Sequence, residues 1–324
     1  MNTQNSGNQN MAKPYFVYGT LKPSEIAYYQ IGKFIERFMP ATLDNYALFV
    51  RDGVPVIFGQ KDWKVDGYLV WPENTKYKEF ELKVRNYEGE RLYSLEKVAV
   101  TCQTKEIESL THIGKNQGKS HAEALDGPWS SKNDPIFSQS FPHLFSEIKK
   151  IIRNKSSVGP EIGDWIYYND ITSKYLLLIT IIERLAYLYS GETFTEPIEK
   201  NGKVVYNDKI MKRITTLGRS EQFLHTYKNL SDRGYLNHIE VYDSRDAKKS
   251  LSTKRPKDAL EALYQVRSNL QHRGKSAWKD VKIVEYSVVS LANILSDLLP
   301  RFIPTLDTTS SFRSNSINDL IPIN

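Results

Sequence analysis

One arginine and one histidine stand close together near the end of a predicted helix. Residues 259–270 carry apolar side chains at helical spacing, and Gly274 then supplies a C-terminal stop. Arg267 lies on the flank of this apolar stripe and His272 lies beyond it, so the core requires neither residue. An imidazole can move a proton and a guanidinium can neutralise charge on phosphate, so the pair suits cleavage of a phosphodiester bond.

Spacing alone does not select this pair. Arg233 and His238 have the same separation, and Arg219 and His225 fit the looser rule with one more spacer. His225 falls on a predicted helix face, where packing is its expected role, and Arg233 falls in a predicted turn. A purely structural role therefore stays open for the pair near residue 270 as well.

The run LYQVRSNLQHRGK, residues 263–275, resembles the Arg-x(4–6)-His signature helix of HEPN domains. In that family the two residues are catalytic in metal-independent ribonucleases that are usually assembled across a homodimer. The resemblance implies catalytic roles for Arg267 and His272, with no metal and no other cofactor. It also implies that RNA is the partner, contacted by Asn269, Arg273 and Lys275. One pair offers one imidazole, whereas such cleavage needs both a base and an acid, so a second copy is expected to supply the missing group.

A second candidate site lies near the start of the chain. Residues 15–18 read as a short strand of aromatic and β-branched residues that ends at Gly19. A glycine loop leaving a strand can turn successive backbone N–H groups toward a bound carboxylate. Further along the chain, Glu88 offers a carboxylate, a group that can act as a general acid or base. The structural alternative is that Gly19 only permits a tight turn and that Glu88 is a surface residue in a loop.

Two motifs in this part resemble the γ-glutamylcyclotransferase-like fold: FVYGTLK at residues 16–22, and NYEG at residues 86–89 followed by a tyrosine. In that family the glutamate is the general acid/base, and the resemblance carries this role to Glu88. The resemblance also implies a substrate-binding set formed by the glycine loop and one later side chain: Tyr18, Gly19, Thr20, Leu21 and Tyr93.

The surrounding elements read as two domains joined by a connector. Alternating and β-branched runs predict a strand-dominated α+β domain over residues 13–115, with one helix near 73–84. Residues 116–160 read as a connector with one helix at 144–152 and a hinge at 154–160. Helical patterns at 164–189, 209–230, from 258 and at 282–299 then dominate residues 161–303, as an all-α bundle would require, and short strands are possible on either side of the turn signal at 201–202. The ends, residues 1–12 and 304–324, are expected to be a disordered and a mobile tail.

Composition limits the class of protein. The 324 residues are 40% hydrophobic and 25% charged, which is typical of a globular chain with room for two cores. No signal peptide and no membrane-spanning run is apparent, and the single cysteine, Cys102, excludes an internal disulfide framework and a cysteine-cluster metal site. His112, His121 and His143 lack the close spacing to other His, Asp or Glu residues that a metal site needs. These features predict a cytoplasmic protein that binds neither membrane nor metal.

The formal charge of +6 is unevenly placed. Residues 241–282 hold 11 Lys or Arg against 5 Asp or Glu, so this window carries a basic excess beside the Arg–His helix. Such an excess suits an RNA-binding surface, because neutralisation of phosphate dominates that affinity. A solvated charged loop is an equally good explanation.

The sequence therefore predicts a multidomain chain: an α+β, cyclotransferase-like small β-barrel domain followed by an all-α HEPN helical bundle. The function that the two resemblances imply is a metal-independent endoribonuclease of the toxin or antiviral defence kind, regulated by a front domain that binds a γ-glutamyl or other small carboxylated ligand. The main rival is an active γ-glutamyl (amine) cyclotransferase whose helical domain only dimerises or binds RNA. A third possibility is that both the ribonuclease site and the cyclotransferase site are inactive and that the protein acts as a binding module.

Overall fold

The computed structural model describes most of the chain, and its contacts divide the chain into two compact units, Met1–Ser130 and Ser131–Asn324. The described residues are 12–51, 53–89, 92–116, 119–153, 165–191, 198–200, 203–205, 209–242, 248–251, 255–273, 280–304 and 306. The expected N-terminal tail (apart from residue 12), the expected hinge at 154–160 and nearly all of the expected C-terminal tail lie outside them.

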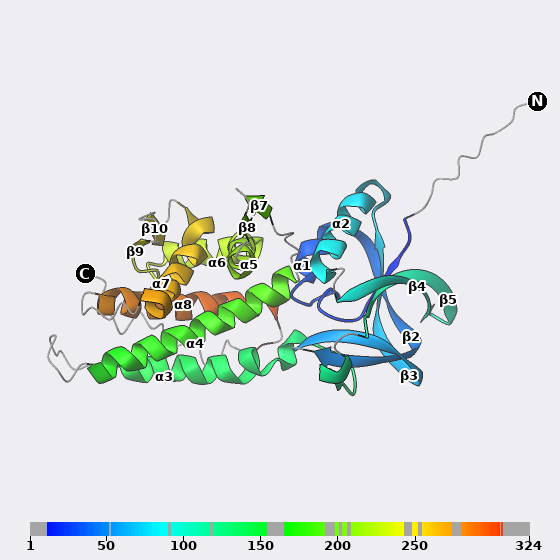
Figure 1. The fold of residues 1–324 in the computed structure, drawn as a ribbon, viewed down its shortest axis with the longest axis horizontal. Helices are drawn as coiled ribbons and strands as arrows, with labels where there is room; N and C mark the ends of the chain where they lie inside the picture. Colours follow the sequence, from blue (N-terminus) through cyan, green and yellow to red (C-terminus); the bar gives the residue numbers. More distant parts are fainter. Residues whose placement is uncertain are drawn as a thin grey trace, which may run out of the picture. The chain divides into compact units, whose positions relative to one another are not determined.

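The first unit is strand-dominated with one principal helix (Figure 1). Residues 98–102 alternate buried and exposed side chains, the pattern of a sheet with one covered face, whereas residues 55–58 form a continuous buried run. Its elements are β1 (Tyr15–Val17), α1 (Tyr28–Ile31), the 3₁₀ helix η1 (Gly32–Phe34), β2 (Ile35–Arg51), β3 (Val54–Pro72), η2 (Asn74–Lys76), α2 (Tyr77–Glu88), β4 (Tyr93–Cys102), β5 (Lys105–Gly114), η3 (Lys119–His121) and β6 (Glu123–Ala124).

The six strands form one sheet in the order β3-β1-β5-β4-β2-β6, and β2 also pairs with β3. The strand pairings therefore form a closed cycle, because β2 pairs with both β3 and β4. The pairing of β2 with β4 consists of a single residue pair, Thr42 with Thr101. The α+β character is confirmed, whereas a closed small barrel stays a prediction. Strand β6 lies within the stretch expected to be connector, and it pairs with β2 at Phe49 and Val50.

Helix α2 covers one part of this sheet because its apolar residues fall on one face. Phe80, Val84 and Tyr87 are spaced four and three residues apart and are all buried. They pack in a cluster that includes Tyr15 and Val17 of β1. The ring of Phe80 meets the ring of Tyr15 edge-on at a centroid distance of 5.0 Å, a favoured aromatic geometry. This packing fixes α2, and therefore its C-terminal end, against β1.

The second unit consists mainly of helices (Figure 1). Its elements are η4 (Ser131–Asn133), the π-helical turn η5 (Ile136–Ser140), α3 (Phe141–Arg153), α4 (Trp165–Ser190), β7 (Ile198–Lys200), β8 (Lys203–Val205), α5 (Lys209–Gly218), α6 (Glu221–Asp232), β9 (Ile239–Tyr242), β10 (Lys248–Leu251), η7 (Pro256–Asp258), α7 (Ala259–Arg273) and α8 (Asp280–Phe302).

The helical character of this unit is confirmed, but the expectation that it is all-α is wrong. Strands β7 and β8 form one two-stranded sheet, and β9 and β10 form another. The second sheet pairs Tyr242 with Lys248 and Ile239 with Leu251. Ile239, Val241 and Leu251 are buried, so the hairpin packs its apolar side inward although its sequence is highly charged.

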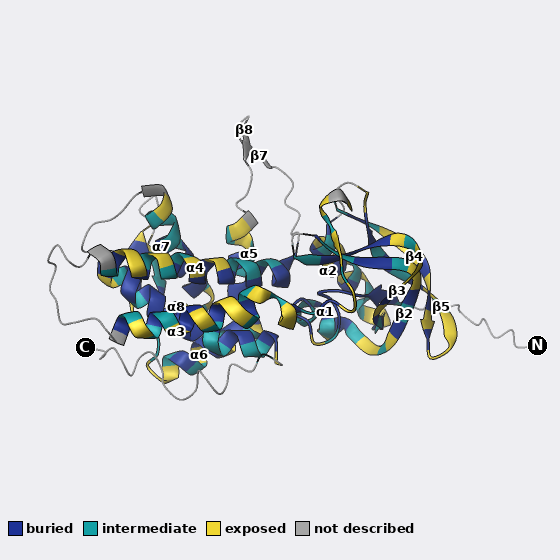
Figure 2. Ribbon diagram, turned by 90° about the horizontal axis from the view of Figure 1, so that it is seen from below, coloured by how far each residue is buried: buried dark blue, intermediate teal, exposed yellow. Residues whose placement is uncertain are grey.

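Helix α8 forms much of the core of the second unit, and Figure 2 shows it largely in the colour of buried residues. Its stretch Val281–Phe302 is long and apolar enough to cross a membrane by length and composition, yet 72% of the apolar window is buried inside the protein. A core helix of a globular unit has this burial, whereas a membrane span exposes its apolar side chains to lipid.

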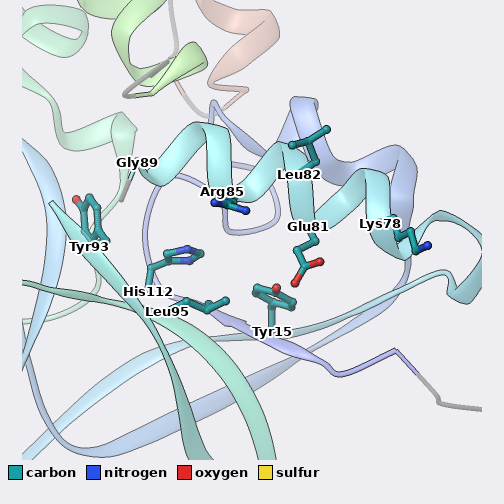
Figure 3. Close-up of a pocket in the computed structure, with 9 residues that line it drawn as sticks. All are labelled: Tyr15, Lys78, Glu81, Leu82, Arg85, Gly89, Tyr93, Leu95 and His112. Carbon is teal, nitrogen blue, oxygen red and sulfur yellow. The ribbon is translucent and has the colours of Figure 1, made fainter. Parts of the chain in front are cut away.

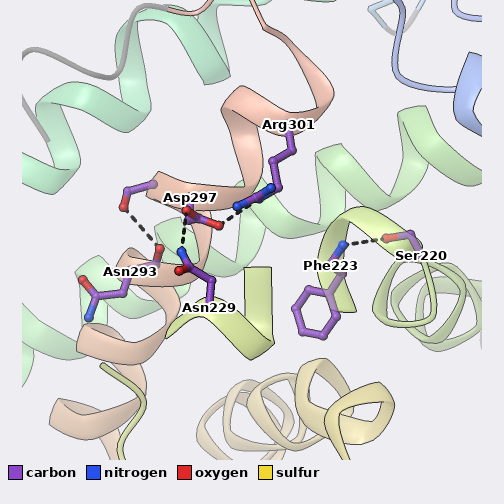
Figure 4. Close-up of polar contacts among 7 residues, drawn as sticks. Ser220, Phe223, Asn229, Asn293, Asp297 and Arg301 are labelled. Atoms are coloured by element: carbon purple, nitrogen blue, oxygen red, sulfur yellow. Dashed lines mark hydrogen bonds and ion pairs between the residues drawn. The ribbon is translucent and has the colours of Figure 1, made fainter. Parts of the chain in front are cut away.

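Polar contacts fix the helix ends around α8 (Figure 4). Asp297 accepts a hydrogen bond from Asn229 at 3.2 Å, and its other oxygen accepts one from Arg301 at 2.9 Å. Ser220 precedes α6, and its hydroxyl oxygen accepts from the backbone N–H of Phe223 at 3.1 Å, the arrangement of an N-cap. These contacts tie α6 to α8 and divide the helical run predicted at 209–230 into α5 and α6.

Candidate functional site

The loop after β1 is a buried turn. Tyr18, Gly19, Thr20 and Leu21 are all buried. The backbone N–H of Lys22 donates to the carbonyl of Gly19 at 3.0 Å, which closes the turn.

Gly19 is needed for a steric reason. A Cβ atom at this position would lie 2.3 Å from the Cγ of Pro55 on β3, which is far inside van der Waals contact. The loop therefore passes directly against β3, and only a residue without a side chain fits there. This is a packing constraint, and it keeps the turn close to the strands that carry the rest of the site.

Glu88 is the last residue of α2, so the alternative that placed it in a loop is wrong. Gly89 follows with a φ of 72°, a backbone conformation that glycine adopts without strain, and its N–H donates to the carbonyl of Arg85 at 3.1 Å. This C-terminal cap ends the helix directly after Glu88 and turns the chain toward β4. The carboxyl thus stands on a rigid helix whose other face is fixed in the core.

The helix end and the glycine loop are connected directly. The hydroxyl of Tyr87 donates to the hydroxyl oxygen of Thr20 at 2.8 Å, and both groups are buried. The bond joins residues 67 positions apart, so it brings the two sequence motifs together in space. Burial raises the pKa of Tyr18 well above its usual value, and the charge of Glu88 raises it further. Glu88 is therefore close to the loop as well.

The environment of Glu88 disfavours its charged form. Desolvation by burial raises the pKa of its carboxyl from 4.5 to about 8. The residue as a whole keeps intermediate exposure. A carboxyl with a pKa near neutrality can accept a proton in one step and return it in the next, which is what general acid/base catalysis needs.

Two further residues belong to this site and were not predicted. Arg51, at the end of β2, is buried; its charge opposes the rise in the pKa of Tyr18, and it faces the ring of Tyr93 at 5.7 Å. His112 of β5 accepts a hydrogen bond from the Tyr18 hydroxyl through its backbone oxygen, at 2.8 Å. Burial lowers the pKa of its imidazole to about 4, so the ring is neutral at pH 7. No local pattern marks either residue.

A groove of about 530 Å³ runs beside α2, within the size range of small-molecule sites (Figure 3). One wall is the flank of α2 and the other comes from strands β1, β4 and β5. Gly89 and Tyr93 lie at one end of it in Figure 3 and Lys78 lies at the other. The residues that line it are Tyr15, Lys78, Glu81, Leu82, Arg85, Gly89, Tyr93, Leu95 and His112.

The second predicted site lies on α7, and its arginine is already engaged. A terminal nitrogen of Arg267 lies 3.6 Å from a carboxylate oxygen of Glu183 on α4. The same guanidinium stacks 5.3 Å above the ring of Tyr264. Asn269 donates to the backbone oxygen of Tyr242 at 3.1 Å, so it supports the β9–β10 hairpin.

The remaining residues of this second site can be placed only in part. Lys275 lies outside the described residues, and the side chains of His272 and Arg273 are not described. The backbone of α7 is helical through Arg273. Residues five apart in a continuous helix are about 140° apart around its axis, so the positions of Arg267 and His272 fall on different faces. Among the described residues, no group of three or more His, Cys, Asp or Glu is arranged to hold a metal ion.

The comparisons with known proteins address the first unit. Residues 15–131 match the family model described as gamma-glutamyl cyclotransferase, AIG2-like. Solved structures that resemble the chain include one from Arabidopsis thaliana (20% identity over 46% of this chain and 93% of that one, TM-score 0.29). Another is an uncharacterized protein from Pyrococcus horikoshii (16% identity over 40% of this chain and 97% of that one, TM-score 0.27).

A structure titled gamma-glutamyl cyclotransferase is similar at 18% identity, over 62% of this chain and 96% of that one, with a TM-score of 0.27. No curated protein matches the sequence of the chain. The family match begins at the first residue of β1 and includes the glycine loop, α2 and the groove. Over residues 15–131, the chain therefore carries an N-terminal cyclotransferase-like α+β domain, similar to the gamma-glutamyl cyclotransferase, AIG2-like family.

Proposed function

We propose that the first unit converts a γ-glutamyl amide into 5-oxoproline and a free amine. The observation that carries the proposal is the position of Glu88, a carboxyl with a raised pKa at a helix end that is hydrogen-bonded to the glycine loop. The family match supports the same chemistry, because the matched domain contains both motifs. The neighbouring groove offers room for a small substrate.

The reaction is an internal aminolysis. The α-amine of the glutamyl group attacks its own side-chain carbonyl, which forms a new C–N bond and closes a five-membered ring. Glu88, in its ionised form, takes the proton that the attacking nitrogen loses. It then gives this proton to the departing nitrogen as the original amide C–N bond breaks, so the carboxylate is regenerated. No oxidant, reductant or co-reactant is consumed.

The glycine loop supplies the binding part of the proposal. Backbone N–H groups of residues 18–21 would hold the α-carboxylate of the substrate, because such groups in a tight turn form an anion-binding concavity. Arg51 adds a buried positive charge near Tyr18. Holding the α-carboxylate places the adjacent amine within reach of the side-chain carbonyl, which removes much of the entropic barrier to ring closure.

The test is release of 5-oxoproline from γ-glutamyl amides by wild type and by Glu88→Gln. Loss of proton transfer at Glu88 should lower kcat by about 10²- to 10⁴-fold. Because the ionised form is the active base, kcat/KM should rise about tenfold per pH unit below pH 8 and level off above it. Glu106→Gln, at an exposed carboxylate on β5, is the matched control and should keep full activity. Equal turnover by Glu88→Gln and wild type would refute the proposal.

A metal-independent ribonuclease in the second unit is the second candidate. It is supported by the HEPN-like run and by Arg267, which keeps a side-chain exposure of 19% on α7 despite its ion pair with Glu183. His272 would transfer the proton while Arg267 stabilises the charged phosphorane, and a homodimer would provide the second imidazole. A bound phosphate would have to compete with Glu183 for the guanidinium.

Incubation of the purified protein with total RNA in EDTA tests this candidate. His272→Ala and Arg267→Ala should each abolish cleavage, whereas His238→Ala, an exposed histidine with the same arginine spacing, should not. Cleavage that survives His272→Ala would exclude this site as its source. A ligand of the first unit would then be added to learn whether it changes the rate, as a regulatory domain should.

A further inference from the structure

The segment that follows β6 is fixed to the first unit by a buried tryptophan. Leu125 donates its backbone N–H to the carbonyl of Leu48 at 2.9 Å, and residues 126–128 are then exposed. Trp129 returns to the interior and is buried. The boundary between the two compact units follows directly, after Ser130. The first unit therefore ends at an anchored side chain.

Trp129 is bonded to the glycine loop. The ammonium group of Lys22 is buried and donates to the backbone oxygen of Trp129 at 2.6 Å. The backbone N–H of the same lysine closes the turn with Gly19. A buried charge is held firmly by its hydrogen-bond acceptors, because the loss of one of them in a dry environment is costly. A change in the position of the glycine loop would therefore act on Trp129.

A second anchor lies five residues further along the chain and belongs to the second unit. The side chain of Asp134 is 8% exposed, and one carboxylate oxygen lies 2.8 Å from a terminal nitrogen of Arg184 on α4. The same oxygen accepts a hydrogen bond from Nε of Arg184 at 2.9 Å, and the other oxygen accepts one from the backbone N–H of Ile136 at 3.0 Å. An arginine that binds through two nitrogens fixes direction as well as distance. The start of η5 is thus tied to α4.

Helix α4 also carries a residue that contacts the second predicted site. Glu183 is next to Arg184 in the sequence, and its carboxylate lies 3.6 Å from Arg267 on α7. Side chains on one helix move together when the helix shifts, because the hydrogen-bonded backbone joins them rigidly. A displacement of α4 through Asp134 would therefore change the distance between Glu183 and Arg267.

We propose that residues 129–134 couple the two units, so that a carboxylate ligand held by the glycine loop keeps Glu183 paired with Arg267. This coupling, which rests on the proposed function, is its regulation. The contacts at each anchor lie within one unit, and the covalent chain joins the anchors. A ligand that orders the loop orders one end of this short segment and so leaves less freedom at the other end. The ligand-bound first unit would thereby restrain the proposed ribonuclease, whose arginine stays engaged.

Hydrogen exchange of the whole chain measures the coupling. Glu88→Gln, which should bind substrate without turning it over, is compared with and without saturating γ-glutamyl-L-leucine. The ligand should slow exchange in η5 and α4 by about fivefold, the lower end of usual coupling between sites. Adding Asp134→Asn, which keeps the shape of the side chain but removes its charge, should abolish this protection while the ligand still binds. Glu147→Gln is the matched control, since it loses an ion pair within α3, with Lys150, and it should keep the protection.

Lys22→Met carries the same test from the other anchor, at a ligand concentration that calorimetry shows to be saturating. It should remove the protection of α4 even if Asp134→Asn does not fold. Ligand binding that leaves exchange in α4 unchanged, or protection that survives substitution at either anchor, overturns the coupling while the cyclotransferase function stands.

Failure of the proposed function is recognised separately. That function fails if wild type releases no 5-oxoproline and calorimetry finds no binding of γ-glutamyl-L-leucine to Glu88→Gln. The coupling is then judged without ligand, by exchange in α4 of Lys22→Met and of wild type. Faster exchange in the variant supports a link from the glycine loop to α4, and equal exchange overturns it.

Discussion

Replacing Glu88 by glutamine should stabilise the folded protein in a pH-dependent way. The carboxyl has a pKa of about 8 in the folded protein against an ordinary value of 4.5. Glutamine has nearly the shape of the protonated acid but cannot ionise. The substitution therefore removes the cost of holding a carboxylate in a dry site, while it also removes the proposed catalytic base.

The sign follows from the raised pKa. Below pH 4.5 the carboxyl is protonated in both the folded and the unfolded chain, so it adds no penalty. Between pH 4.5 and 8 the unfolded chain releases the proton and the folded chain keeps it, so the penalty on folding grows with pH. Above pH 8 both forms are ionised and the penalty is constant, at most about 5 kcal/mol; at pH 7 it is at most about 3 kcal/mol. Because the residue keeps intermediate exposure, solvent reduces both values.

Urea unfolding of wild type and Glu88→Gln at pH 5, 7 and 9 measures this difference. The variant should be within about 1 kcal/mol of wild type at pH 5 and clearly more stable at pH 9. Titration of the glutamate Cδ resonances by NMR should show one carboxyl near pH 8 that disappears in the variant. The exposed control Glu106→Gln should show no growing gain. A constant stability difference across the three pH values would refute the claim that Glu88 is desolvated.

Three structural predictions concern the parts that hold the site and the second unit. Gly19→Ala should cost about 1–3 kcal/mol of unfolding free energy through its clash with β3, whereas Gly59→Ala, which meets nothing within 4 Å, should cost much less by the same thermal unfolding measurement. Tyr87→Phe should cost about 1–2 kcal/mol and lower cyclotransferase activity, since it breaks the buried bond to Thr20; a variant as stable as wild type would contradict this. Asp297→Ala removes the acceptor of two hydrogen bonds and should lower the stability of the second unit by about 2 kcal/mol, measured by hydrogen exchange in α6 and α8.

Much of the fold could be predicted because its signals are local. The helix expected at 164–189 is α4, and the helix expected at 144–152 lies within α3. Both have apolar residues at regular helical spacing over several turns. The motifs around Gly19 and Glu88 were visible for a similar reason, since each is a short run with its own chemistry. Their proximity in the structure follows from packing of α2 on β1, which the sequence suggested only through family resemblance.

The features that were not predicted depend on contacts between distant segments. Strand β2 begins at Ile35. Residues 36–38 are all exposed, so the sequence shows no alternation of apolar and polar residues that would predict the start of this strand. The segment of the β9–β10 hairpin was interpreted as part of a basic loop because of its lysines. Its two buried apolar residues, Val241 and Leu251, are too few to form a recognisable strand pattern. The apolar stripe indicated only that the core does not require Arg267. Its partner Glu183 lies on another helix, so spacing within one segment cannot reveal the ion pair.

The hydrogen bond between Tyr87 and Thr20 has a consequence for ligand screening. Both halves of the site come from segments that meet only in the folded domain, so the unfolded chain has no site to offer a ligand. Any true ligand must then protect the first unit against denaturation, by about 2.7 kcal/mol at a concentration one hundred times its Kd. A melting-shift survey of small γ-glutamyl compounds could thus find the natural ligand even in a variant that has lost turnover.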